Sequence, residues 1–421
     1  MLHERHEITV FEANDYVGGH TNTVRVDTAH STHHVDTGFI VFNDRNYPLF
    51  ERLLERIGVA WQPSTMSFSV SDGRGDFEYS SSSPAGLFAK PAHLIDPRFH
   101  RMLADLVRFR RAARRLLATQ DGDPSLGDWL ARERFSEGFI ERLIVPQASA
   151  VWSAEPASRW TFPARFLLEF FDNHGMFEVR GRPRWRTIQG GSARYAEALT
   201  EPFGARIRIG TPVEAITRSE DHVSIRTPGH DPEHFDEVVL ATHSDQALAL
   251  LSDATALERE VLGSIPYQPN EAVLHTDASM LPRRRRAWAS WNYHLGGDRT
   301  AQERHRDARP SGAPVAGPAG GPPEGRARVT YHMNRLQSLD ADRELCVTLN
   351  RTEEIDPGRI VRRIEYAHPV FTAAGVRAQG RRAQISGINR THFCGAYWGW
   401  GFHEDGVASG VHVAERFGGR L

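Results

Sequence analysis

The sequence has few cysteines and almost no lysine. Its 421 residues include two cysteines, Cys346 and Cys394, and a single lysine, Lys90, among 51 basic side chains. Two cysteines build neither a disulfide framework nor a cysteine-rich metal cluster, so we expect a reducing compartment and no metal site. Any chemistry that needs a lysine amine has to use Lys90. The preference for arginine itself we attribute to codon bias.

Long apolar runs and an excess of one charge are also missing. No stretch stays apolar for the roughly 20 residues that a membrane-spanning helix needs. The charged N-terminal segment lacks the apolar core of a signal peptide. The formal net charge is −2, which gives no reason to expect a nucleic-acid partner. We therefore expect a cytoplasmic protein that is long enough for two domains and a large core.

Hydrophobic patterns predict a mixed α/β chain. Residues 7–12 are typical of a buried parallel strand that ends in an acid, and residues 238–242 are typical of another. Apolar residues at helical spacing predict a helix over residues 47–58 and a C-terminal helix over about residues 406–417. Three short runs predict an antiparallel meander: residues 207–209, 213–216 and 223–225.

A basic amphipathic helix is predicted over residues 97–120. Apolar side chains fall on one face, and arginines between Arg108 and Arg115 supply the charge. Such a helix can dock on an anionic membrane, so peripheral contact with the inner face of the membrane is one expectation; a solvated helix face is the commoner explanation. Residues 299–326 are rich in Gly, Pro, Ala and Arg and predict a flexible surface insertion.

An acid and a double glycine follow the first predicted strand. In a dinucleotide-binding fold, an acid at the end of the fold's second strand accepts hydrogen bonds from ribose hydroxyls. Glu12 ends the first strand predicted in this chain and is a candidate for that role. Gly18 and Gly19 allow the backbone to approach a cofactor closely. A surface acid beside an ordinary turn is equally compatible with this pattern when it is taken alone.

A second double glycine, Gly190-Gly191, directly precedes a predicted helix. Such a junction can place a helix N-terminus against an anion. A plain connection from loop to helix explains the same residues, and in isolation it is the favoured explanation.

From Phe393 to Gly406, glycines alternate with large aromatic residues, and acids then precede a helix. Glycines permit a tight backbone approach, and aromatic rings can form an apolar wall against a ring system. The positive end of the helix would stabilise negative charge that develops there. An aromatic-rich core segment is the alternative, which the density of glycine makes the weaker one.

Together, these motifs resemble FAD-dependent oxidoreductases of the amine oxidase, protoporphyrinogen oxidase and phytoene desaturase group. The similarity is greatest to a bacterial branch associated with cyclopropane-fatty-acid synthases. The matching segments are VFEANDYVGGHTNT from Val10, DTGFIVFN from Asp36, WRTIQGGSARY from Trp185 and FCGAYWGWGFHEDG from Phe393.

The resemblance implies a discontinuous, Rossmann-like FAD/NAD(P)-binding domain and a substrate domain of mixed antiparallel sheet and helices. We expect the FAD-binding parts at residues 1–46, 185–250 and 366–421, and the substrate domain at residues 47–184 and 251–365. Relatives begin with a strand and a G-x-G-x-x-G loop before the equivalent of His6. This chain starts later, for which we expect a misassigned start codon or a truncation.

The resemblance also implies a cofactor role, position by position. Glu12 would hold the adenosine ribose, and Val213 would present its backbone to the adenine. The remaining implied FAD contacts are Gly18, Gly19 and His20 on the pyrophosphate and flavin side, and Gly395, Gly406 and Val407 at the ribityl chain and flavin.

The chemistry implied is hydride transfer to flavin N5, for which the protein positions the substrate and excludes water. Amine oxidases commonly place a lysine near N5, and the C-terminal half of this chain has none, which argues against ordinary amine oxidation. His403 and Glu404 are the predicted catalytic residues, with His20 as a further candidate base. Histidine suits this role because its charge changes near neutral pH.

A group of aromatic residues either lines an apolar tunnel or packs the core, which is the default for most of them. Its members are Trp152, Trp160, Phe162, Phe166, Phe170, Phe171 and Phe177. The leading hypothesis is an FAD enzyme that oxidises or desaturates an apolar substrate, such as a modified fatty acyl chain. The alternatives are an accessory subunit, flavin-binding or flavin-free, of a partner resembling a cyclopropane-fatty-acid synthase, and an amine oxidase proper.

Overall fold

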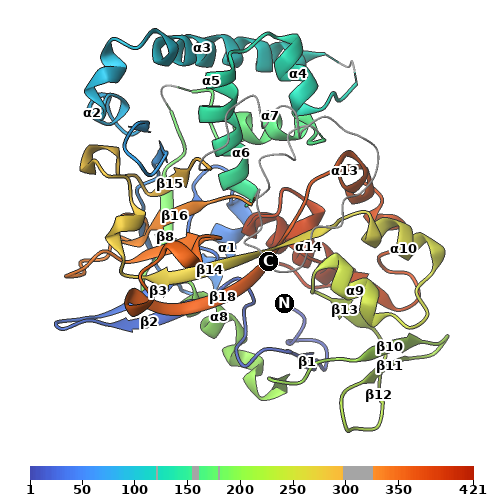
Figure 1. Cartoon of the computed structure of the whole chain (residues 1–421). Helices are drawn as coiled ribbons and strands as arrows, with labels where there is room; N and C mark the ends of the chain where they lie inside the picture. Colours follow the sequence, from blue (N-terminus) through green and yellow to red (C-terminus); the bar gives the residue numbers. More distant parts are fainter. Residues whose placement is uncertain (120–121, 154–160, 179–180, 297–325) are drawn as a thin grey trace.

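The computed structural model describes residues 1–119, 122–153, 161–178, 181–296 and 326–421. They form a mixed α/β structure, as expected (Figure 1). Its largest sheet has seven strands, and their spatial order is β18 (Ile360–Pro369), β14 (Tyr267–His275), β17 (Cys346–Leu349), β16 (Val329–His332), β15 (Trp291–His294), β6 (Phe68–Ser71) and β7 (Glu78–Ser80). Neighbouring strands are antiparallel except β15 and β6, which run parallel.

A layer of helices packs on this sheet and forms the top of Figure 1. These helices are α2 (Pro84–Leu87), α3 (Pro97–Ala118), α4 (Leu126–Arg132), α5 (Glu137–Phe139), α6 (Val145–Trp152) and α7 (Ala164–Asn173). One hydrophobic cluster joins the apolar faces of α3 to α7 with the strands beneath them. Strands β16 and β17 are consequently buried at every position.

Helix α3 confirms the predicted amphipathic helix. The side chain of Asp96 accepts a hydrogen bond from the Arg98 N–H, and Pro97 occupies the first turn, where its missing N–H costs nothing. The buried face carries residues such as Met102 and Phe109. Val107, one of the apolar residues of this helix, is not on the buried face and is 50% exposed.

The rest of the chain carries two separate pairs of short parallel strands. Strand β1 (Val10–Phe11) pairs with β9 (Ile207–Arg208), and β13 (Val238–Leu240) pairs with β19 (Thr391–Phe393). The predicted meander is therefore wrong in its first strand, because residues 207–208 pair with β1. The antiparallel sheet beside it is β10 (Ala215–Arg218), β11 (Val223–Arg226) and β12 (Glu233–Phe235).

Smaller elements connect these parts. They are the hairpin β2 (Thr23–Asp27) and β3 (Thr32–Asp36), the sheet β4 (Phe42–Asn43), β8 (Trp185–Ile188) and β5 (Trp61–Pro63), and the helices α1 (Pro48–Arg56), α8 (Ala193–Thr200), α9 (Ser244–Leu250), α10 (Ala256–Gly263), α12 (Met333–Leu336), α13 (Ala373–Gln379) and α14 (His403–Arg416). Helix α1 confirms the helix predicted over residues 47–58, and Gly58 follows it with a φ of +69°. Helix α14 begins three residues before the predicted Gly406.

Some predictions concern residues that the structure does not describe. The expected insertion at 299–326 lies outside the described residues apart from its last position, and so does Trp160. Within the described part, no helix is long and apolar enough to cross a membrane. The described residues also contain no group of three or more His, Cys, Asp or Glu side chains that could hold a metal ion.

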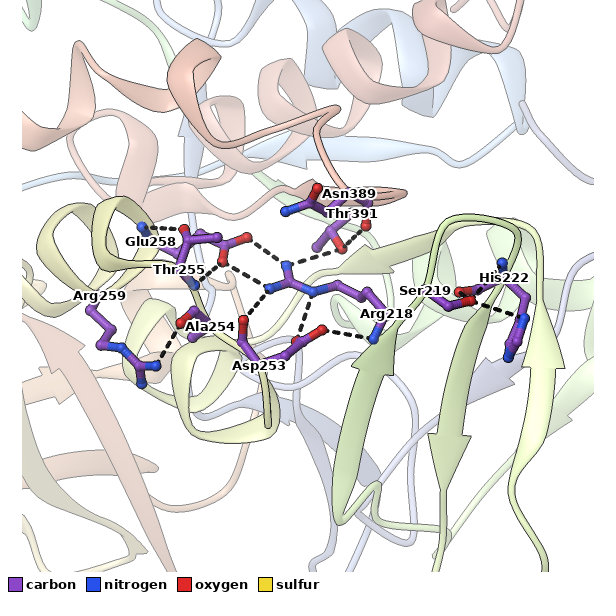
Figure 2. A network of polar contacts seen from close by, with 10 residues as sticks. All are labelled: Arg218, Ser219, His222, Asp253, Ala254, Thr255, Glu258, Arg259, Asn389 and Thr391. Atoms are coloured by element: carbon purple, nitrogen blue, oxygen red, sulfur yellow. Dashed lines mark hydrogen bonds and ion pairs between the residues drawn. The ribbon is translucent and has the colours of Figure 1, made fainter.

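A buried ion pair fixes β10 to α10 (Figure 2). The Arg218 and Glu258 side chains are each 3% exposed, and two hydrogen bonds of 2.5 and 2.9 Å join guanidinium to carboxylate. Arg218 Nε also donates to Asp253 at 2.9 Å. Burial alone would raise the pKa of Glu258, but hydrogen bonds from Arg218 and Thr255 lower it overall.

Replacing Arg218 with Met should lower the free energy of unfolding by about 3–5 kcal/mol, because Glu258 would stay buried without its partner. The control is Arg226→Met on β11, where an exposed pair with Glu214 contributes about 0–1 kcal/mol. Denaturant unfolding of both variants measures the difference. Folding lowers the pKa of Glu258, so the unmodified protein should also lose stability as the pH falls below the pKa of a free carboxyl. The R218M variant should lose less stability over the same pH range. Equal, small losses in both variants would contradict this assignment.

Candidate functional site

The glycine loop after β1 has two consecutive residues with positive φ, Gly18 and Gly19. Gly18 has a φ of +123°, and a Cβ there would lie 2.8 Å from the Thr21 carbonyl oxygen, so only glycine fits. Gly19 has a φ of +56°, and a Cβ there would meet no atom within 4 Å. The loop therefore presents open space at Gly19. At its start, the half-buried Glu12 carboxylate accepts hydrogen bonds from Asn14 N and Nδ2 at 2.9 and 3.1 Å.

The loop meets the first residue of α14, so segments from both ends of the chain converge here. His403 Nε2 lies 3.1 Å from the Thr21 hydroxyl and 2.5 Å from the Tyr195 hydroxyl. The His403 ring stacks on Phe39, with centroids 3.5 Å apart. Burial lowers the pKa of His403 to about 3, so the imidazole is neutral at neutral pH.

The next two residues of α14 hold neighbouring backbone. Both carboxylate oxygens of Glu404 accept hydrogen bonds from the first turn of α1, from Leu49 N at 3.0 Å and Phe50 N at 2.9 Å. The Asp405 carboxylate accepts from Phe402 N at 2.9 Å, which caps α14 and explains its early start. A Cβ on Gly399 would lie 2.1 Å from Asp405 Oδ1, so this close approach requires glycine.

The other predicted cofactor residues lie around this turn or beside Glu12. Gly395 N donates to Ser409 Oγ, in the second turn of α14, at 2.8 Å. Around Gly406, a Cβ would meet only Ala396, at 3.9 Å or more, and Val407 is half-buried. Val213 lies in the loop after β9, which Thr211 N joins to the Glu12 carbonyl at 2.9 Å. No measured contact assigns these residues to a cofactor, so their roles stay predictions.

The second double glycine serves a structural junction. Ser192 N donates to the buried Asp36 carboxylate at 2.8 Å, and Ala193 N donates to the Thr23 hydroxyl at 2.8 Å. A Cβ on Gly191 would lie 2.5 Å from Thr23 Cγ2. The N-terminus of α8 thus faces an anion, but the anion is the chain's own carboxylate.

The aromatic group is mostly core. Its six described members are less than 9% exposed and belong to the main hydrophobic cluster. The cluster nevertheless extends to the turn before α14, where Phe170 stacks on Phe402 with centroids 5.2 Å apart. Trp152 Nε1 donates to the Trp400 carbonyl at 2.9 Å. An aromatic wall from α6 and α7 therefore borders the site.

His20 lies in a cluster of histidines that sequence reasoning missed. Its ring centroid is 5.3 Å from that of His368 and 5.8 Å from that of His243. His243 lies three residues after the end of β13. The carboxyl ends of parallel strands are where α/β folds bind ligands, so its position in the sequence was a signal for this site. His368, near the end of β18, carried no local signal. Thr21 and Tyr195 stood inside recognised motifs without an assigned role.

These features fit a dinucleotide. His20 Nε2 is buried with no hydrogen-bond partner within the described protein, and an unsatisfied buried nitrogen of this kind is expected where a ligand binds. The open space at Gly19 and Gly406 admits close approach to the backbone. Glu12 lies directly after β1, and an acid at the end of a strand is in the position that suits a ribose.

Comparison with known proteins gives a family. The family described as flavin containing amine oxidoreductase matches residues 1–279. No curated protein matches significantly.

Solved structures share the fold across nearly the whole chain. Cyclohexylamine oxidase from Brevibacterium oxydans is 13% identical with a TM-score of 0.66, covering 99% of this chain and 95% of its own. A fatty acid isomerase from P. acnes that produces CLA is 16% identical with a TM-score of 0.62, covering 97% and 92%. A candidate protoporphyrinogen oxidase from Exiguobacterium is 18% identical with a TM-score of 0.62, covering 97% and 92%.

The family match over two thirds of the chain confirms the predicted resemblance, the fold and the cofactor. The chain belongs to the flavin-containing amine oxidoreductases and is an FAD-dependent oxidoreductase.

Proposed function

We propose that the protein oxidises or desaturates an apolar substrate, such as a modified fatty acyl chain. The observation that carries this proposal is the aromatic wall beside α14. Phe170, Phe402 and Trp400 place apolar surface next to the turn that leads into His403. A hydrocarbon chain that reacts there would pack against these rings, which offer a large apolar area.

The position of the lysine supports this choice. Lys90 Nζ donates to the Asp76 carbonyl and lies 4.0 Å from the Asp76 carboxylate. The chain has no other lysine, so a lysine near the flavin, as is common among amine oxidases, could come only from this residue, which is already engaged with Asp76. The fold similarity to a fatty acid isomerase is in keeping with a fatty acyl substrate.

When bound, FAD supplies a hydride acceptor. Glu12, Gly18, Gly19, His20, Val213, Gly395, Gly406 and Val407 are the residues that would hold it. The chain's own contribution is to orient the substrate and exclude water. His403 is neutral and accepts or donates hydrogen bonds at two hydroxyls, which suits a positioning role, because an imidazole with a pKa of about 3 is a weak base at neutral pH.

A substrate screen tests the proposal. Under anaerobic conditions, the bound flavin should lose its yellow absorbance with unsaturated or cyclopropane fatty acyl chains, and the products should contain two hydrogens fewer. Primary amines of matched chain length serve as the control. Bleaching by amines with peroxide release in air, and none by acyl chains, would replace this proposal with amine oxidation.

An apolar substrate raises the question of access from a membrane. Among the residues that the structure describes, seven large apolar side chains are exposed, and three of them lie within residues 94–107: Leu94 is 57% exposed, Ile95 86% and Val107 50%. They flank or belong to α3, which carries seven arginines and one acid, Asp105, whose side chain is fully buried. We propose that this surface, residues 91–115, binds the anionic face of a membrane.

Co-sedimentation with vesicles measures this binding. The protein should sediment with phosphatidylcholine vesicles that contain phosphatidylglycerol, and not with phosphatidylcholine alone. Arg111→Gln with Arg114→Gln should weaken binding by an order of magnitude or more, since each arginine near an anionic surface contributes about 1 kcal/mol. Leu94→Asp with Ile95→Asp should abolish it, whereas Val361→Asp, at an apolar site 42% exposed on β18, should not. Equal binding by all variants would refute the docking surface.

A further inference from the structure

Three histidines from distant segments meet beside the glycine loop. His20 follows Gly19, His243 lies between β13 and α9, and His368 lies near the end of β18. Centroid distances of 5.3 and 5.8 Å join His20 to the other two rings. All three side chains are half-buried, so each keeps some surface through which a ligand can reach the cluster.

Almost nothing acidic balances these three bases. The ionisable groups that act on His20 are the imidazoles of His368, His243 and His403. Tyr366 stacks on His20 at 4.6 Å, and Tyr267 stacks on His243 at 4.4 Å. Of the three histidines, His243 is the one on which an acid acts, and that acid is Asp245 in the first turn of α9.

The protein by itself therefore keeps the cluster uncharged. Burial, followed by repulsion from the other imidazoles, lowers the pKa of His20 to about 3. The same causes lower the pKa of His368 to about 4, and burial lowers that of His243. At neutral pH the three rings are neutral.

Hydrogen bonds fix the tautomer of His368. Asn350 Nδ2 donates both to the Ala327 carbonyl and to Asn270 Oδ1, each at 2.8 Å. Asn270 must then present its Nδ2 to His368 Nδ1, 2.9 Å away, and Nδ1 must accept. The ring proton of His368 is left on Nε2 as a donor. His20 Nε2 is the buried nitrogen without a partner.

We propose that His20, His243 and His368 form an anion site that receives the pyrophosphate of FAD, and that the cluster takes up about one proton when it binds. A metal is not the ligand, because no group of three such side chains among the described residues is arranged to hold one. The pyrophosphate is the anionic part of FAD, and an opposite charge at this distance stabilises imidazolium. Three adjacent rings cannot all be charged, since each imidazolium disfavours the next.

This inference rests on the FAD cofactor and not on the substrate class. Its linkage has a definite sign: the pKa of the cluster is higher in the complex than in the free protein. Binding is therefore strongest at low pH. It weakens by about tenfold per pH unit, for one proton, as the pH rises from the pKa of the free cluster to the raised pKa of the complex, and it levels off above that.

Calorimetry on the flavin-free protein tests the inference. FAD, ADP and riboflavin are titrated in two buffers of different ionisation enthalpy, and the difference in heat gives the protons taken up. FAD and ADP, which carry a pyrophosphate, should both take up protons, and riboflavin should not. A fatty acid is the fourth ligand, because a carboxylate could occupy the same site. Uptake with the fatty acid and none with ADP would overturn the assignment to pyrophosphate.

Single variants identify the groups that are protonated. His243→Asn and His368→Asn should each reduce both the proton uptake and the slope of FAD affinity against pH, with unfolding curves confirming that the variants fold. The matched control is His234→Asn, an exposed histidine 4.3 Å from His222 on β11 and β12, which should change neither quantity. FAD binding without proton uptake, unchanged uptake in both cluster variants, or no FAD binding at all would overturn the proposal. The first two outcomes leave the substrate proposal intact, because that proposal is judged by the products of turnover.

Discussion

The buried carboxylate of Asp36 is the constraint on which the site depends. It is fully buried, and four donors surround it: the hydroxyls of Thr23 and Ser192, the backbone N–H of Ser192 and the amide of Gln337, at 2.6 to 2.9 Å. Burial raises its pKa to about 6. A buried carboxyl without these partners would be costly, so the three segments that supply them must meet here. They are β2, the start of α8 and the segment after α12.

This junction sets the position of the residues around His403. Thr21 lies two residues before Thr23, and Tyr195 lies three residues after Ser192, so fixing the junction fixes both hydroxyls. Both hydroxyls contact His403 Nε2 and also contact each other, while Phe39 covers the ring. Glu404 and Asp405 then hold α1 and the preceding turn. The first turn of α14 is thus held through three consecutive side chains, which explains how a region rich in glycine can present a rigid surface.

Local patterns predicted the elements better than their pairing. The spacing of Leu49, Phe50, Leu53 and Leu54 was enough to predict α1, and the amphipathic pattern from residue 97 onward was enough to predict α3. The strand that pairs with residues 207–208 could not be predicted from such local patterns, because β-branched residues favour a strand without indicating which strand lies beside it. The true partner lies almost 200 residues away. Helix α14 starts early because Asp405 caps it from inside the turn. The histidine cluster escaped prediction since it joins three segments whose proximity only the folded chain reveals.

The choice of histidine at the anion site has a physical reason in the stability of the chain without its cofactor. Arginine cannot lose its proton in a protein, so three buried arginines would repel one another whenever the site was empty. Where this fold does bury an arginine, at Arg218, it surrounds the guanidinium with Glu258 and Asp253. Imidazoles need no such acids, because they shed their charge when buried. A site built from imidazoles can stay neutral until an anion binds. Because such a site does not need acidic side chains to balance its charge, no carboxylate has to be placed where it would repel the anion.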